Sequence, residues 1–172
     1  MQNFKVIFLG GKQAGVIGLL TTISFGCDVR AVVTVSDELR QVAQELQLPV
    51  YNSVINVQHL LNDIDLMISV HSREIVPQSL LDIPRLGGIN VHPCLSEYKG
   101  KNPIQRFLNG SSKQASVGVH KMTELVDMGQ TLKEIFIDVN REEVKTVIEV
   151  YNLIYPYYSL ALIKALQELR ND

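Results

Sequence analysis

The sequence predicts an α/β fold: a Rossmann-like, mostly parallel sheet with helices on both faces. Short segments rich in Val, Ile, Leu and Phe are apolar at nearly every position, which is typical of strands buried on both faces of a parallel sheet. These segments alternate with stretches of helical character. Parallel neighbours require this alternation, because a crossover connection, usually a helix, must join them.

The first half of the chain supplies strand and helix in turn. A strand over residues 4–9 leads into a Gly10–Gly11 turn and a helix over residues 14–25. Ser36, followed by two acidic residues, is a typical helix start. The other strands expected here are residues 28–35, 48–51 and 65–70, and the other helices are residues 36–47 and 54–61, the last capped by residues 52–53.

The second half begins with a polar loop and returns to strand and helix. Asn102, with Pro103 after it, starts a helix that Gly110 closes. Pro156 is expected to interrupt a long C-terminal helix. The expected strands are residues 86–91, 115–122 and 131–139, and the helical segments are residues 77–81, 102–109 and from 142 or 143 to about 170. No repeat, linker or low-complexity segment divides the sequence, so we expect one domain over residues 1–172.

Composition excludes several classes of protein. With 46% hydrophobic residues, 20% charged residues and a formal net charge of -2, the chain lacks the basic character of a nucleic-acid binder. The two cysteines, Cys27 and Cys94, are far apart, which argues against a zinc site or a disulfide framework. We find neither a signal peptide nor an apolar run long enough to cross a membrane, so we expect a cytoplasmic protein with no membrane partner.

The end of the fifth strand carries two polar side chains. Asn90 and His92 are two residues apart, so they point to the same face of the strand, and Pro93 follows directly. An amide and an imidazole on one face, at a strand end where the chain turns, are suited to activating a carbonyl group.

The first turn is a weaker candidate site. Gly10, Gly11 and Gly15 do not have the spacing of the dinucleotide-binding fingerprint, which favours a tight turn with close helix packing. A helix N-terminus can nevertheless hold a phosphate. We therefore keep Gly10, Gly11 and Lys12 as candidate substrate-binding residues.

Four motifs follow one another in the second half of the chain: Asn90-Val91-His92-Pro93, Tyr98 to Pro103, Val117 to Glu124, and Val126-Asp127-Met128-Gly129. Together they resemble the folate-dependent formyltransferase family, which includes glycinamide ribonucleotide, methionyl-tRNA and amino-sugar formyltransferases. The resemblance is strong from about residue 63 to residue 140. It implies a formyltransferase fold and 10-formyltetrahydrofolate as co-substrate, with no metal.

The resemblance also implies roles for individual residues. Asn90 and His92 would stabilise the oxyanion of a tetrahedral intermediate, and Asp127 would orient His92 and handle the proton of the attacking amine. His120 matches a family position that supports the site. The residues implied in folate binding are Arg73, Glu74, Ile75, Val76, Asn90, Thr123, Glu124 and Asp127.

Departures from the family pattern bear on the acceptor and on activity. Cys94 replaces a usual serine, and the turn over residues 95–97 is one residue shorter. The loop over residues 10–13 lacks the usual Ser-Asn of the glycinamide ribonucleotide phosphate loop, which argues against that acceptor.

Several side chains have less specific interpretations. A thiol nucleophile at Cys94 and a metal site formed by three histidines and Asp127 are both disfavoured, since no base is placed for the thiol and the spacing matches no usual ligand pattern. His59 and His71 are expected to face solvent or to cap local structure. The tyrosines around Pro156 are interpreted as a helix packing face.

The sequence thus predicts a formyltransferase that acts on a primary amine of a small substrate, with a nucleotide-linked amino sugar as the favoured acceptor. We do not expect a tRNA acceptor, because of the net charge and because no additional C-terminal domain follows. The alternatives are a methionyl-tRNA or glycinamide ribonucleotide formyltransferase, a formyltetrahydrofolate hydrolase, and a non-catalytic folate-binding module. The sequence also leaves open whether the protein forms a homodimer.

Overall fold

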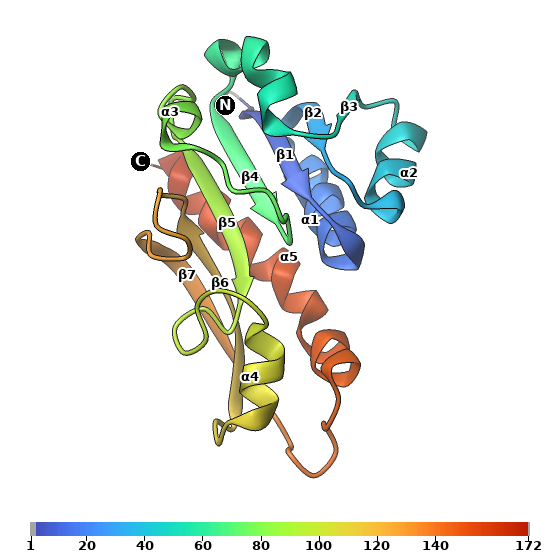
Figure 1. Cartoon of the computed structure of the whole chain (residues 1–172), viewed down its shortest axis with the longest axis vertical. Coiled ribbons are helices and arrows are strands. Elements are labelled where there is room, and N and C mark those ends of the chain that lie inside the picture. The colour runs from blue at the N-terminus through green and yellow to red at the C-terminus, as the bar shows by residue number, and fades with distance from the viewer. Residues whose placement is uncertain (1–2, 172) are drawn as a thin grey trace.

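The computed structural model describes residues 3–171, which form a seven-stranded sheet with helices on both faces (Figure 1). The strands are β1 (Lys5–Gly10), β2 (Asp28–Val33), β3 (Val50–Tyr51), β4 (Leu66–Val70), β5 (Gly88–Pro93), β6 (Gln114–Lys121) and β7 (Thr131–Asp138). The helices are α1 (Lys12–Ser24), α2 (Asp37–Glu45), the 3₁₀ helix η1 (Val54–Asp63), α3 (Gln78–Leu81), α4 (Pro103–Asn109) and α5 (Val147–Asn171).

The sheet has the order β3-β2-β1-β4-β5-β6-β7. Neighbours from β3 to β5 are parallel, and β6 and β7 add antiparallel pairs at one edge. The predicted fold class, a mostly parallel Rossmann-like sheet, is therefore confirmed. After β2 and β3 have been laid on one side of β1, the chain crosses to β4 on the other side. Ligands of open α/β sheets bind at the carboxyl ends of the strands beside such a reversal.

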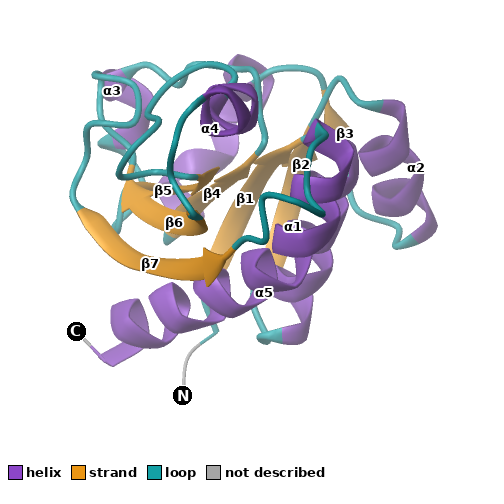
Figure 2. Cartoon of the chain, turned by 90° about the horizontal axis from the view of Figure 1, so that it is seen from below, coloured by secondary structure: helices purple, strands orange, loops and turns teal. Residues whose placement is uncertain are grey.

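Two apolar layers cover the sheet. Along β1, Val6 and Phe8 pack into the layer that contains α1 and α5, whereas Ile7 and Leu9 pack into the layer beneath η1 and α3 (Figure 2). All four side chains are fully buried. Burial on both faces explains why the strand is apolar at successive positions, because alternating side chains point to opposite faces.

The structure corrects several predicted local features. Residues 54–63 form a 3₁₀ helix rather than an α-helix, and Val54 and Val57, three positions apart, are buried on the same side. The C-terminal helix begins at Val147, not at residue 142 or 143, and it continues through Pro156. Buried Ile154 and Tyr158 anchor the helix on both sides of the proline, so their packing offsets a cost of about 3 kcal/mol.

Some boundaries and caps also differ from the prediction. Strand β5 continues through Pro93, two residues beyond the expected end. The side chain of Asn102 makes no capping hydrogen bond, because its backbone is left-handed, with φ of 54°. Among residues 3–171, no helix has the length and apolar character needed to span a bilayer.

Candidate active site

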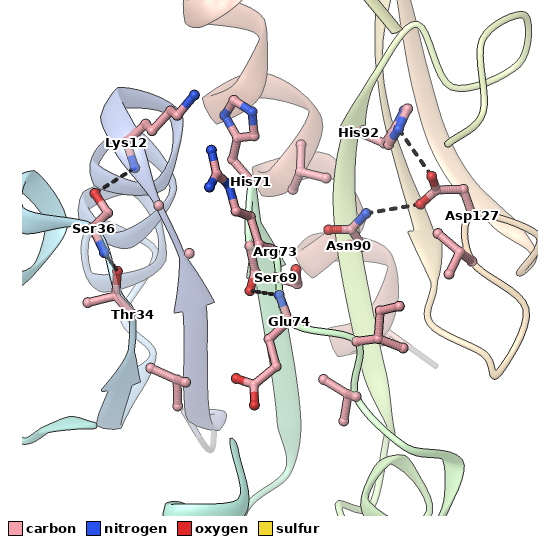
Figure 3. A pocket seen from close by; sticks show the side chains of 18 of the residues that line it. Lys12, Thr34, Ser36, Ser69, His71, Arg73, Glu74, Asn90, His92 and Asp127 are labelled. Atoms are coloured by element: carbon pink, nitrogen blue, oxygen red, sulfur yellow. Dashed lines mark hydrogen bonds and ion pairs between the residues drawn. The ribbon is translucent and has the colours of Figure 1, made fainter. Parts of the chain in front are cut away.

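A cavity of about 900 Å³ opens at the carboxyl ends of β1, β4 and β5. The first turn, the loop after β4, the end of β5 and the loop around Asp127 all contribute to its wall (Figure 3). The predicted catalytic residues Asn90, His92 and Asp127 line this cavity, and so do the predicted substrate-binding residues Gly10, Gly11 and Lys12. Residues that are distant in the sequence therefore meet at the edge where an open α/β sheet binds ligands.

Asp127 lies at the centre of a polar cluster on one wall. Its Oδ2 is 3.1 Å from His92 Nε2 and accepts a hydrogen bond of 2.8 Å from the Gly100 N–H. Its Oδ1 is 3.2 Å from His120 Nε2 and accepts from the Asn90 amide at 3.4 Å. Because Asp127 is only 7% exposed, these partners replace the water that a carboxylate would otherwise bind.

The cluster keeps Asp127 ionised. Burial favours the protonated acid, but hydrogen bonds from His120 and His92 oppose that effect, and so does the Gly100 N–H. The balance holds the pKa of Asp127 well below its ordinary value. At neutral pH this side chain is therefore a fixed negative charge that accepts hydrogen bonds.

His120 supports the cluster from β6. Its Nδ1 is 2.8 Å from the carbonyl oxygen of Lys121, which can only accept, so Nδ1 carries a proton. Its Nε2 is 3.2 Å from the Asn90 amide nitrogen. Nε2 of His120 therefore contacts both the Asn90 amide and the Asp127 carboxylate.

The side-chain NH₂ group of Asn90 is turned toward the polar cluster and not toward the cavity. Its amide nitrogen faces Asp127 and His120, and Figure 3 shows its oxygen on the opposite side, toward the cavity. Asn90 can donate to an oxyanion in the cavity only after its side-chain amide rotates by about 180°, so that nitrogen and oxygen exchange places.

His92 presents one nitrogen to the cluster. Its Nε2 lies between Asp127 and the carbonyl oxygen of Gly100, at 3.1 Å and 3.2 Å, and both partners accept, so Nε2 carries a proton. Its Nδ1 is buried and has no hydrogen-bond partner within residues 3–171.

The predicted folate loop borders the same cavity. Arg73, Glu74, Ile75 and Val76 all line it. The Glu74 carboxylate accepts from the Val54 N–H at 2.9 Å and 3.0 Å, which ties the loop to the start of η1. Thus Glu74 holds the loop in place, while Ile75, at 69% exposure, presents apolar surface.

The second predicted folate loop is only partly at the cavity. Thr123 lines it. Glu124 does not line it, and its backbone N–H donates to the side-chain oxygen of Gln78 at 3.0 Å.

The first turn packs closely, as predicted. A Cβ atom added at Gly10 would lie 3.0 Å from the carbonyl oxygen of Val70, and one at Gly11 would lie 3.2 Å from that of His71. The Lys12 N–H donates to the Ser36 hydroxyl at 2.9 Å. The turn therefore brings the ends of β1 and β4 and the start of α2 together around one end of the cavity.

The prediction for His71 was wrong. This residue lines the cavity and stacks on Tyr151 of α5, with ring centroids 5.8 Å apart. Burial, as the larger cause, and the positive charge of nearby Lys12, as the second, lower the pKa of His71 to about 4. The sequence could have indicated this position, because His71 directly follows a strand whose carboxyl end borders the cavity.

Two other predictions for side chains agree with the structure. His59 is exposed, as expected. Tyr158, at 1% exposure, confirms the packing role for its part of α5.

The backbone around the cavity contains left-handed residues that are not glycine. Lys12, His71, Asn102 and Asp127 line the cavity, and Cys94 follows one of its lining residues. Their φ angles lie between 52° and 58°. This conformation costs a non-glycine residue roughly 1–2 kcal/mol, so the surrounding structure must enforce it.

Cys94 is a buried thiol and not an activated one. Burial raises its pKa to about 11. We expect Cys94→Ser to keep kcat within about threefold of wild type, because no nucleophile is removed. Formyl-donor turnover and thiol labelling at pH 7.5 measure this: native Cys94 should stay unlabelled until the chain unfolds. Rapid labelling of the native thiol, together with loss of turnover in the variant, would instead assign Cys94 a chemical role.

Within residues 3–171, no group of three or more His, Cys, Asp or Glu side chains is arranged to hold a metal ion.

Known proteins resemble this chain in sequence and in fold. The model of the formyl transferase family matches residues 50–154. The chain is 31% identical to a methionyl-tRNA formyltransferase of Rickettsia massiliae, with 97% of this chain and 60% of the relative aligned. It is 27% identical to the bifunctional polymyxin resistance protein ArnA of Wigglesworthia glossinidia brevipalpis, with 81% of this chain and 24% of the relative aligned. The chain thus spans three fifths or less of these relatives.

Solved structures share the fold. A phosphoribosylglycinamide formyltransferase from Anaplasma phagocytophilum superposes with a TM-score of 0.82 at 20% identity, over 96% of this chain and 86% of that one. A formyltetrahydrofolate deformylase from Pseudomonas syringae also gives 0.82, at 17% identity, over 96% of this chain and 60% of that one.

Proposed function

Because this chain belongs to the formyl transferase family, we propose that it transfers a formyl group from 10-formyltetrahydrofolate to a primary amine of a small acceptor in the cytoplasm. The observation that carries this proposal is the ionised, buried Asp127 between His92, His120 and Asn90 on the wall of an open cavity. Pure binding of a folate does not require this arrangement.

The cavity wall has features suited to the formyl donor. Ile75, Val76 and Val126 offer apolar contacts for a flat ring system, and the loop that carries Ile75 is held in place by Glu74. The donor would supply the formyl carbon, and its N10 would leave with a proton.

The side chains of the cluster then have distinct roles in the transfer. Attack by the amine nitrogen forms a tetrahedral carbon, and negative charge develops on the formyl oxygen. The turned carboxamide of Asn90 donates to that oxygen. An N–H at Nδ1 of His92, the ring nitrogen that Asp127 and Gly100 leave without a partner, is the second donor. Asp127 fixes the orientation of His92. Its negative charge also guides the proton that leaves the amine nitrogen, through water, to the departing folate nitrogen.

For the acceptor, we favour a nucleotide-linked amino sugar. At the end of the cavity away from Asp127, the chain places Lys12 and Arg73 together with the hydroxyl-bearing Thr34 and Ser36 (Figure 3). Cations suit phosphate groups, and hydroxyl groups suit sugars. The relatives also name methionyl-tRNA and phosphoribosylglycinamide formyltransferases, and a deformylase would use water in place of the amine.

The proposal is tested with 10-formyltetrahydrofolate and a panel of acceptors. We expect release of tetrahydrofolate only when an amine is present, with formation of the N-formyl product followed by mass spectrometry. The panel includes nucleotide-linked amino sugars, glycinamide ribonucleotide, methionyl-tRNA and buffer alone. Release in buffer alone would identify a hydrolase. Tight folate binding without turnover of any acceptor would favour a non-catalytic module.

A further inference from the structure

His71 is a basic group of the cavity that the chemistry around Asp127 does not use. It follows the last residue of β4 and lines the cavity (Figure 3). In that figure the imidazole lies between Lys12 on one side and the Asn90–Asp127 cluster on the other. It therefore borders the end of the cavity that holds the acceptor in the function proposed above.

The imidazole packs against the aromatic side chains of α5. Tyr151 stacks on it at 5.8 Å with an interplanar angle of 27°, and Tyr155 stacks on Tyr151 at 5.6 Å, also at 27°. Both tyrosines belong to α5. The backbone of His71 is left-handed, with φ of 58°, which directs the side chain away from the path of β4. A ring that is already packed against Tyr151 loses less conformational entropy when it binds a ligand than a free ring would.

The structure also indicates which ring nitrogen carries the proton. Nδ1 is buried and has no hydrogen-bond partner within residues 3–171. A buried N–H without an acceptor is rarer than a buried acceptor without a donor, so Nδ1 is the bare nitrogen and Nε2 carries the hydrogen. Since burial lowers the pKa of His71 to about 4, this Nε2–H is a donor of an uncharged ring at neutral pH.

The groups nearest to His71 are also donors. Lys12 and Arg73 line the cavity with it. The carboxylate of Glu74 is turned toward the N–H of Val54, out of their way. Two acidic residues, Asp37 and Glu38, line the cavity at the start of α2, and the Glu38 carboxylate accepts a hydrogen bond from the Ser36 hydroxyl at 2.6 Å.

We propose that His71 is a specificity-determining residue for the acceptor, whose Nε2–H donates to an anionic oxygen of a phosphoryl or carboxylate group on the amine substrate. The proposal rests on the proposed function, because it concerns the second substrate of that same cavity. His71, Lys12 and Arg73 together then favour acceptors that carry an anion over neutral amines.

Two variants separate the hydrogen bond from the packing. His71→Phe keeps an aromatic ring to stack on Tyr151 but has no donor. His71→Gln places an amide N–H close to the position of Nε2. Both residues must adopt the same left-handed backbone, so they share its strain. His59→Phe, at an exposed histidine outside the cavity, is the matched control.

Binding of two probe anions by isothermal titration calorimetry tests the proposal without catalysis. Inorganic pyrophosphate represents a phosphoryl group, and malonate represents a carboxylate. We expect at least one of them to bind wild type, the dissociation constant to rise about tenfold or more in His71→Phe, and His71→Gln and His59→Phe to stay within about threefold. The probe that binds more tightly identifies the class of anion. In wild-type protein labelled at histidine, the ¹⁵N resonance of His71 should shift when that anion is added.

The outcomes separate this proposal from the proposed function. Equal anion affinity in wild type and His71→Phe, or no anion binding by wild type, overturns the role of His71 even when amine formylation is observed. His71-dependent anion binding without turnover of any amine supports the anion contact and counts against formyl transfer. With a turned-over acceptor, His71→Phe should raise KM about tenfold and leave kcat within about threefold.

Discussion

Replacing Asp127 with Asn is expected to lower kcat about a thousandfold or more, while the affinity for 10-formyltetrahydrofolate stays within a few-fold. The physical reason is the loss of a fixed negative charge. The carboxylate accepts from His92 and from the Gly100 N–H through Oδ2, and it contacts Asn90 and His120 through Oδ1. An amide has only one accepting atom, so at least one of these two sets of partners faces an N–H that cannot accept.

Steady-state turnover and folate binding by fluorescence titration measure the two parts of this prediction. Asp63→Asn is the control, since Asp63 is an exposed partner of Lys5 and lies outside the cavity lining. Turnover of Asp127→Asn within tenfold of wild type would remove the proton-handling role of Asp127. A parallel loss of folate affinity would show that Asp127 mainly shapes the binding pocket.

The second large effect is expected at Asn90. Asn90→Ala removes one of the two donors proposed for the oxyanion, and loss of such a donor typically lowers kcat by about 10²–10³-fold. KM should change much less, because the donor acts on charge that develops only in the transition state. Stopped assays of formyl transfer give both constants, and Asn56→Ala, at an exposed position of η1, is the control.

The observed orientation of Asn90 makes this prediction sharper. Its amide nitrogen faces Asp127 and His120, so the carboxamide must turn before it can donate into the cavity. After the turn, its oxygen lies near His120 Nε2 and Asp127 Oδ1, so the turn gives up the hydrogen bond to Asp127 in exchange for a donor that faces the cavity. If Asn90→Ala retains kcat within threefold, the oxyanion is held by His92 or by backbone groups alone.

Most of the fold could be predicted because the local patterns agree with the tertiary structure. Strand β1 is apolar at successive positions, and both of its faces are covered. The continuation of α5 through Pro156 could not be predicted in this way. It depends on burial of Ile154 and Tyr158, which are on either side of the proline in sequence and become buried only against the folded chain.

The site was predictable to the extent that local geometry or family likeness determines it. Asn90 and His92 follow from the alternation of side chains along one strand. Asp127 is 37 positions from Asn90, and its contact with Asn90 depends on how the loops fold together, so only the resemblance to a family indicated it. The carboxamide orientation of Asn90 and the stacking of His71 on Tyr151 depend on three-dimensional neighbours that no local pattern reveals.

The left-handed backbone around the cavity requires conformational free energy, and folding supplies it before any ligand binds. Lys12, His71, Asn102 and Asp127 adopt a conformation that an unfolded chain rarely visits. The free energy required to reach it is supplied once, when the sheet and helices form. These four backbone positions are then already formed before a ligand arrives. In the proposed reaction, stability given up during folding would thus be exchanged for a cavity that is shaped in advance.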